Sequence, residues 1–150
     1  MILVGANLIG CAPYALALSP PTFSKCIDHI NFSIRTFNEK RKPLVGYLNE
    51  NFPNAKFTYL NAYAISHELL DNPSRYGFKV TTTACCGLGR KRGSIVCPRN
   101  QIPRKNRDEH CFWDSYHVTE AANLVIARKL LSDEAEFFTY PFTISQLARL

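Results

Sequence analysis

The sequence has no uninterrupted run of about 18 apolar residues, the length that an α-helix needs to cross a bilayer, so no membrane-spanning segment is predicted. It also has no internal repeat and no low-complexity segment. An apolar share of 46% is ordinary for a globular chain and argues against disorder. With 150 residues, the chain is expected to form one domain or part of one.

Acidic residues are absent from one stretch, residues 90–107, which accounts for the net charge of +6. The rest of the chain holds eleven basic and twelve acidic residues. A basic cluster can bind nucleic acid, but this one lacks interleaved aromatic residues and any known binding motif. A solvated basic loop is therefore the favoured interpretation, and no nucleic-acid partner is expected. The seven basic residues of the stretch are Arg90, Lys91, Arg92, Arg99, Arg104, Lys105 and Arg107.

The six cysteines include no Cys-x-x-Cys pair. An even number of cysteines in a short chain favours disulfides and a secreted protein. The Asn31-Phe32-Ser33 glycosylation sequon would be usable only in a secreted chain. A rival hypothesis is a zinc site, although adjacent cysteines and spacings of eleven and fourteen residues match structural zinc patterns poorly. Its candidate ligands would be Cys85, Cys86, Cys97, His110 and Cys111.

The N-terminal segment allows two interpretations. Residues 1–19 are apolar, and Ala15-Leu16-Ala17 could imitate a signal-peptide cleavage site. However, the segment has no basic n-region, and Asn7, Gly10 and Pro13 interrupt its apolar run. The favoured prediction is a buried strand over residues 2–4, followed by a loop.

Strand and helix signals alternate in the first half of the chain. Apolar residues recur at helical spacing from Ser24 to about Leu48 and predict a core-packed helix that Pro43 kinks or divides. A short aromatic-rich strand is expected over residues 56–60 and another helix over residues 61–71. Strand, helix and strand in this order favour a parallel βαβ unit, whose active sites gather at the carboxyl ends of the strands.

Residues 75–112 show no sustained period. A loop this long inside a compact domain needs an explanation, and disulfides can hold such a loop in place of apolar packing. At least one disulfide is therefore predicted within residues 85–111. A second is predicted between Cys11 and Cys26, tying the loop after the first strand to the first helix.

Asp114 and His117 lie three residues apart, just before an apolar-periodic segment that Thr119 can cap as a helix. A carboxylate at this spacing can accept a hydrogen bond from one ring nitrogen of His117, stabilise the imidazolium and leave the other nitrogen free as a base. A structural histidine and a second helix cap are the competing interpretations. His29, His67 and His110 have no neighbouring motif and are expected on the surface.

Several blocks together carry a resemblance to a known family. Residues 112–123, Phe-Trp-Asp-Ser-Tyr-His-Val-Thr-Glu-Ala-Ala-Asn, resemble the last conserved block of the plant-type GDSL esterase/lipases, a branch of the SGNH hydrolases. Three further segments resemble family blocks in the same order: residues 10–13, 72–78 and 84–87. The resemblance runs from about Leu3 to Leu131.

This resemblance implies ester hydrolysis through an acyl-serine intermediate, without metal or cofactor, on carboxylic or lipid esters. His117 would be the general base and Asp114 its orienting partner. The nucleophile of the family lies in a Gly-Asp-Ser block, and its oxyanion-hole Gly and Asn lie in blocks upstream of the matched region. None of these three blocks occurs in this sequence. The family also commonly has proline at position 118 and cysteine at position 104, where this chain has Val118 and Arg104, so one thiol is expected to remain unpaired.

The expected fold is α/β: part of a three-layer, flavodoxin-like parallel sheet with flanking helices. Residues 1–150 are expected to be the C-terminal part of a single hydrolase domain, with the nucleophile block absent. The expected function is that of a secreted ester hydrolase, and the alternatives are a catalytically inactive fragment and a secreted interaction module.

Overall fold

The computed structural model describes residues 1–22 and 25–150. Its centre is a small sheet with strand order β1-β2-β3, formed by β1 (Ile2–Val4), β2 (Thr58–Leu60) and β3 (Thr139–Tyr140). β1 and β2 are parallel, with Leu3 opposite Tyr59. The mixed α/β architecture and the parallel pairing of the first two strands confirm the predicted fold class.

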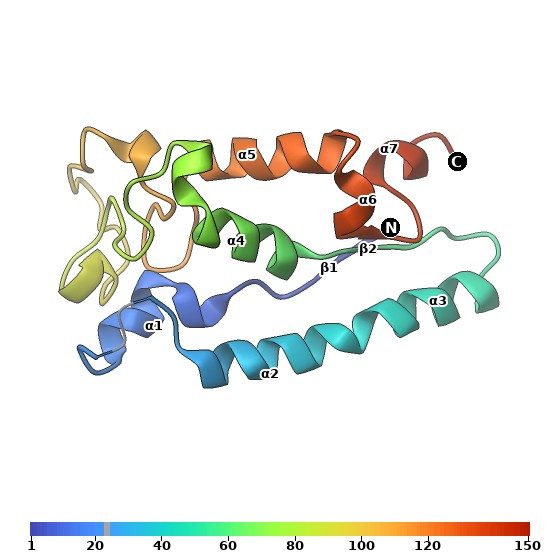
Figure 1. Cartoon of the computed structure of the whole chain (residues 1–150), viewed down its shortest axis with the longest axis horizontal. Coiled ribbons are helices and arrows are strands. Elements are labelled where there is room, and N and C mark those ends of the chain that lie inside the picture. Colours follow the sequence, from blue (N-terminus) through green and yellow to red (C-terminus); the bar gives the residue numbers. More distant parts are fainter. Residues whose placement is uncertain (23–24) are drawn as a thin grey trace.

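The helices cover the sheet from two sides. In Figure 1, α2 (Asp28–Glu39) and α3 (Arg41–Asn51) run along one side, and α4 (Ala62–Asp71) and α5 (Glu120–Leu131) along the other. α1 (Pro13–Leu18) and the irregular segments of residues 77–119 gather at one end of the molecule. Among the described residues, no helix is long and apolar enough to cross a membrane. The remaining elements are η1 (Ile9–Cys11), η2 (Pro73–Tyr76), η3 (Arg90–Arg92), η4 (Arg107–Glu109), α6 (Ala135–Phe138) and α7 (Ile144–Leu147).

The long helix predicted around Pro43 is divided, as expected, but its outer face is not core. The predicted start at Ser24 lies outside the described residues, and α2 begins at Asp28. The break between the two helices falls at Lys40. Pro43 therefore stands in the first turn of α3, where its missing N–H costs no helical hydrogen bond. Of the apolar stripe, Ile27 is buried but Phe37 is exposed. Figure 1 shows why: no other element of the described chain lies beyond α2 and α3 on that side.

β3 departs from the predicted all-parallel sheet, because it is antiparallel to β2. The residues after α5 make long-range hydrogen bonds to the sheet. The backbone N–H of Asn61 donates to the Phe138 carbonyl (N···O 2.7 Å), and the Thr58 hydroxyl donates to the carbonyls of Tyr140 and Phe142. These bonds between distant segments bring the C-terminal chain back onto the sheet.

Two apolar clusters form the core on the α4–α5 side. One cluster, which includes Phe78 and Phe112, lies near the irregular end, and the other includes Ile65 and Phe138. Ile126 of α5 packs against both. α5 therefore joins the sheet to the segment that carries Asp114 and His117.

Lys129 of α5 ties three elements together. Its side chain is buried, and its Nζ lies 2.9 Å from Glu68 Oε1 of α4 and 2.8 Å from Glu134 Oε2, just before α6. The Tyr76 hydroxyl also donates to Glu68. The hydrogen bonds from Tyr76 and Lys129 hold the pKa of the Glu68 carboxyl below its usual value, so the carboxylate remains charged opposite the ammonium.

We predict that Lys129→Met destabilises the chain, because it leaves Glu68 without its buried partner. Glu134 is partly exposed, so the loss of unfolding free energy should be about 1–3 kcal/mol rather than the full cost of an orphaned buried charge. Arg128→Met, at the exposed neighbouring position of the same helix, is the matched control and should change stability little. Urea unfolding of both variants measures the difference, and equal stabilities would contradict the prediction.

Candidate active site

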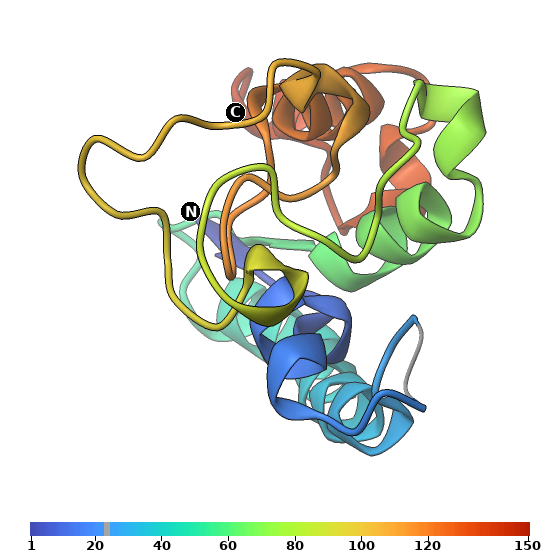
Figure 2. The ribbon, with the colours of Figure 1, turned by 90° about the vertical axis from the view of Figure 1, so that its left-hand side faces the viewer.

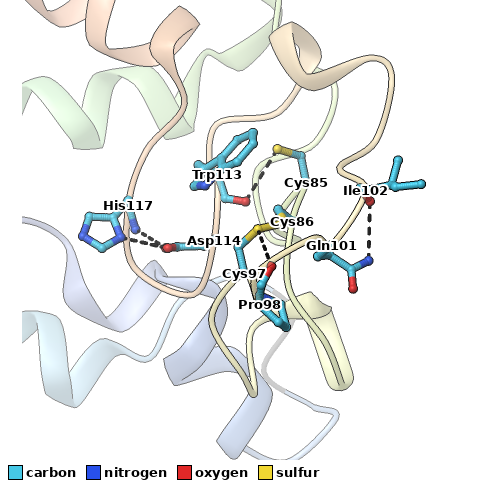
Figure 3. Close-up of a disulfide and its surroundings, with 9 residues drawn as sticks. All are labelled: Cys85, Cys86, Cys97, Pro98, Gln101, Ile102, Trp113, Asp114 and His117. Atoms are coloured by element: carbon cyan, nitrogen blue, oxygen red, sulfur yellow. Dashed lines mark hydrogen bonds and ion pairs between the residues drawn. A yellow bond between two sulfur atoms is a disulfide. The ribbon is translucent and has the colours of Figure 1, made fainter.

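The Asp114 carboxylate lies at the centre of the candidate site. Its Oδ1 accepts hydrogen bonds from the backbone N–H groups of Tyr116 and His117, each at 2.9 Å. The Nδ1 of the His117 ring lies 2.9 Å from Oδ1 and 3.0 Å from Oδ2. The predicted side-chain contact is therefore present, and Figure 3 shows it. The catalytic role of the pair stays a prediction.

The segment around the pair is a short, tightly bonded hairpin. Phe112 and Val118 form an antiparallel bridge, and the N–H of Trp113 donates to the His117 carbonyl (N···O 2.8 Å). From outside the hairpin, the N–H of Tyr14 in α1 donates to the Ser115 carbonyl at 3.1 Å. Backbone hydrogen bonds within the hairpin and from α1 thus fix the turn, even though Val118 stands where the family commonly has proline.

The helix after the hairpin begins as the sequence predicts. The Thr119 hydroxyl accepts a hydrogen bond from the N–H of Ala122 and caps α5. The same hydroxyl donates to the His110 carbonyl (2.7 Å), which fixes the start of the helix against the chain entering the hairpin. The position of His117 therefore depends on α5 as well as on Asp114.

Asp114 remains ionised across the physiological pH range. Burial is the largest influence and by itself raises the pKa of this carboxyl, but the hydrogen bonds from the His117 and Tyr116 backbone and from the His117 ring together hold the pKa below its usual value. The negative charge of the Asp114 carboxylate beside His117 Nδ1 makes Nδ1 the nitrogen that carries the proton in the neutral ring. It therefore leaves Nε2 as the basic atom.

The far side of the His117 ring is open. Its side chain is 76% exposed, whereas that of Asp114 is only 11% exposed. Within the described chain, Asp114 supplies the hydrogen bonds of the ring, and no serine hydroxyl bonds to Nε2. The adjacent Ser115 is fully buried, and its Oγ has no hydrogen-bond partner in the described structure. Ser115 is therefore not presented to the base.

An apolar cavity of about 380 Å³ lies beside the hairpin, lined by the two neighbours of His117, Tyr116 and Val118. The loop after β1, the helices α4 and α5, and Phe112 complete its wall. Tyr116 also packs against Tyr14, with ring centroids 4.9 Å apart. Sequence reasoning missed this cavity and the tyrosine pair, because the residues come from segments that only the tertiary fold brings together. The other lining residues are Asn7, Leu8, Ile9, Ala12, Ser66, Leu69, Leu70, Cys111, Phe112 and Ile126.

Both disulfide predictions are confirmed. Cys11 and Cys26 are bonded, with Cα atoms 4.2 Å apart, and join η1 to the segment before α2. Cys86 and Cys97 close the second bridge, inside the irregular region (Figure 3). Cys85 and Cys111 are free and buried, so two thiols remain unpaired where one was expected.

The zinc hypothesis and the expectation that His110 lies on the surface are wrong. Two of the five proposed zinc ligands, Cys86 and Cys97, are consumed in a disulfide, and the described residues contain no cluster of potential ligands. His110 is buried rather than on the surface, with Nδ1 3.1 Å from the Thr83 carbonyl oxygen. Asn31 of the sequon is also buried, and its side-chain amide bonds Gly10 N and Cys11 Sγ.

Comparisons with known proteins identify relatives of the chain. Residues 1–130 match the family model of GDSL-like lipases and acylhydrolases. The chain is 48% identical to GDSL esterase/lipase At4g18970 and 46% identical to GDSL esterase/lipase At1g29670, both from Arabidopsis thaliana. Each match covers 99% of this chain but only 41% and 40% of the relatives. The chain therefore spans about two fifths of their length.

We predict that Asp114→Asn lowers the stability of the chain by about 1–2 kcal/mol near neutral pH, because the amide loses the charge that three N–H groups share. A depressed pKa stabilises the folded state above the usual carboxyl pKa of 3.8 and loses this effect as pH falls through the lowered value. The difference between wild type and variant should therefore shrink in acid. Asp71→Asn is the control, since the Asp71–His67 pair is mostly exposed.

We predict that Arg104→Cys forms a disulfide with Cys85. The N–H of Arg104 donates to the Cys85 carbonyl (N···O 3.1 Å), so the two backbones are already neighbours. Thiol titration of the unfolded protein should give two thiols for wild type and one for the variant. Lys105→Cys, one position farther on, should give three. Three thiols in Arg104→Cys as well would refute the pairing.

Proposed function

Because the chain belongs to the family of GDSL-like lipases and acylhydrolases, we propose that residues 1–150 are the C-terminal part of a serine ester hydrolase domain and supply its acid–base machinery. The observation that carries the proposal is the Asp114–His117 pair, with Nδ1 bonded to the buried carboxylate and the rest of the ring open to solvent. A structural histidine would not need this exposure. A helix-cap role for Asp114 does not fit either, because the cap of α5 is Thr119.

In the proposed reaction, His117 Nε2 removes the proton from a serine hydroxyl as its oxygen attacks the ester carbonyl carbon. The imidazolium that forms is stabilised by Asp114, which remains ionised. Nε2 then gives the proton to the departing alkoxide, and an acyl-serine remains. Water attacks the acyl-serine with the same base, and this step releases the carboxylic acid and regenerates the serine.

The serine and the oxyanion donors would come from a polypeptide with the Gly-Asp-Ser block of the family. This chain has no such block. The free side of β1 fits this division of labour: in the described sheet β1 pairs with β2 alone, and Ile2 and Val4 are exposed. An added parallel strand would pair with the backbone groups of this edge.

We propose esters with an apolar acyl or alcohol group as substrates. The cavity is almost entirely apolar in its lining, to which the two sequence neighbours of His117, Tyr116 and Val118, contribute. Such a cavity favours a hydrocarbon group over a sugar or a charged group. The two disulfides support the further proposal of a secreted protein, since they persist in oxidising compartments.

The second candidate is a chain without catalytic activity of its own, and the observation that favours it is that no nucleophile contacts His117 in the described residues. Losing the nucleophile removes the acyl-enzyme route, and losing one oxyanion donor alone costs about 10²–10³ in rate. We therefore predict that the 150-residue polypeptide does not hydrolyse nitrophenyl esters above background.

The test compares this polypeptide with a chimera in which the upstream three fifths of the Arabidopsis relative At4g18970 precede it. The chimera should be active. His117→Ala should abolish turnover, and Asp114→Asn should reduce it by about 10²-fold or more. His67→Ala is a matched control, because His67 also pairs with a carboxylate (Nδ1 to Asp71 Oδ2, 2.7 Å) but outside the site; its activity should be unchanged.

Two results would overturn the proposal. Turnover by the short polypeptide that His117→Ala abolishes would mean that a serine of this chain acts as the nucleophile. An active chimera that tolerates His117→Ala would mean that His117 is not the base.

A further inference from the structure

Residues 88–107 contain the basic stretch of residues 90–107 and are called the basic loop below. They expose aliphatic side chains among their cations. Figure 2 shows the loop reaching away from the body of the molecule (olive to brown). Ile102 is 83% exposed, the highest value for any large apolar side chain described, and Leu88, Ile95 and Val96 are exposed as well. Isolated exposed aliphatic residues need no explanation, but four on one loop are a recognition signal.

The cations of the loop have two different environments. Arg90 is engaged internally, since its guanidinium donates to the carbonyls of Ala17 and Ser19 at the end of α1. The others on the outer part of the loop are exposed: Arg99, Arg104, Lys105 and Arg107. The loop itself contains no carboxylate. Asp108 and Glu109 follow it, and Glu109 is paired with Lys79 (Oε1 to Nζ 2.6 Å).

The loop is held in this shape by its own bonds. The Cys86–Cys97 disulfide closes one half, and Leu88 and Ile95 form an antiparallel bridge inside it. In the other half, the Arg104 N–H donates to the Cys85 carbonyl at 3.1 Å. Fixed at both ends, the exposed aliphatic side chains cannot retreat into the core without breaking these contacts.

We propose that the basic loop docks this protein on a surface of anionic lipid. Cations near such a surface are attracted to its headgroups, and aliphatic side chains at the same level enter the acyl boundary. A nucleic acid would use the cations but would leave Ile102 in water, and residues 88–107 contain no aromatic ring on which a base could stack. The combination of exposed cations and aliphatic residues therefore favours a lipid surface.

Docking in this way would leave the Asp114–His117 pair accessible. In Figure 3, Ile102 and the ring of His117 lie on opposite sides of the Cys86–Cys97 disulfide. The loop would then act as an anchor and not as the route by which substrate reaches His117. The proposal consequently does not depend on the proposed ester hydrolysis and can fail or succeed without it.

The test is co-sedimentation of the 150-residue chain with vesicles of phosphatidylcholine, alone or mixed with phosphatidylglycerol. We expect binding to the mixed vesicles only, decreasing as salt is added. Arg104→Gln and Lys105→Gln should each weaken binding about fivefold. Ile102→Ser should weaken it about tenfold. Phe137→Ser is the matched control, because Phe137 is equally exposed (81%) but lies in α6, at the other end of the molecule (Figure 1).

Three results would overturn the proposal. Equal loss from Ile102→Ser and Phe137→Ser would mean that the loop is not the docking site. Undiminished vesicle binding by Ile102→Ser, with matching retention on heparin, would mean a simple polyanion patch. Absence of binding to the mixed vesicles would exclude lipid docking. Near-ultraviolet circular dichroism and a count of two thiols verify that each variant is folded.

Discussion

The hydrogen bonds that converge on the Asp114 carboxylate determine the geometry of the candidate site. One oxygen receives two backbone N–H groups of the turn and, together with its partner oxygen, the His117 ring. The carboxylate therefore shapes the turn and orients the base at the same time. The backbone hydrogen bonds help to keep the pKa of the Asp114 carboxyl low. The negative charge that would stabilise a catalytic imidazolium is therefore present before any substrate binds.

Side-chain amides of the helices play the same part elsewhere in the fold. Asn38 of α2 bonds the backbone of Ala6 through both ends of its amide, at 2.8 and 2.7 Å. Asn49 of α3 does the same for Phe57, just before β2. These buried or half-buried amides position the segments next to the two parallel strands. Such contacts are costly to leave unmade, which makes the register of the sheet specific.

The sequence predicted the elements whose signals are local. The bounds of β1, the division of the long helix near Pro43 and the cap at Thr119 follow from patterns of a few residues, but the predicted burial of β1 is wrong, since Ile2 and Val4 are exposed. The contact of Asp114 with His117 follows from a spacing of three. The resemblance to the GDSL esterase/lipases supplied the family, and the structure could not have done so from three short strands.

Other features could not be predicted, because they depend on segments far apart in the chain. Burial of His110 requires the Thr83 carbonyl, and β3 exists only because β2 offers it an edge. The apolar cavity is built from residues between Asn7 and Ile126. No periodicity or spacing reports such contacts. Asn31 belongs with them, since only the fold shows that its amide is occupied.

The engagement of Asn31 has a consequence for biosynthesis. Oligosaccharyl transfer needs the same amide nitrogen that, in the folded chain, bonds Cys11 Sγ beside the Cys11–Cys26 bridge. In a secretory pathway, a glycan would thus have to be attached before the folded chain buries and engages this amide. The fraction of molecules that carry a glycan at Asn31 would then report how quickly α2 packs against η1 after the chain enters the lumen.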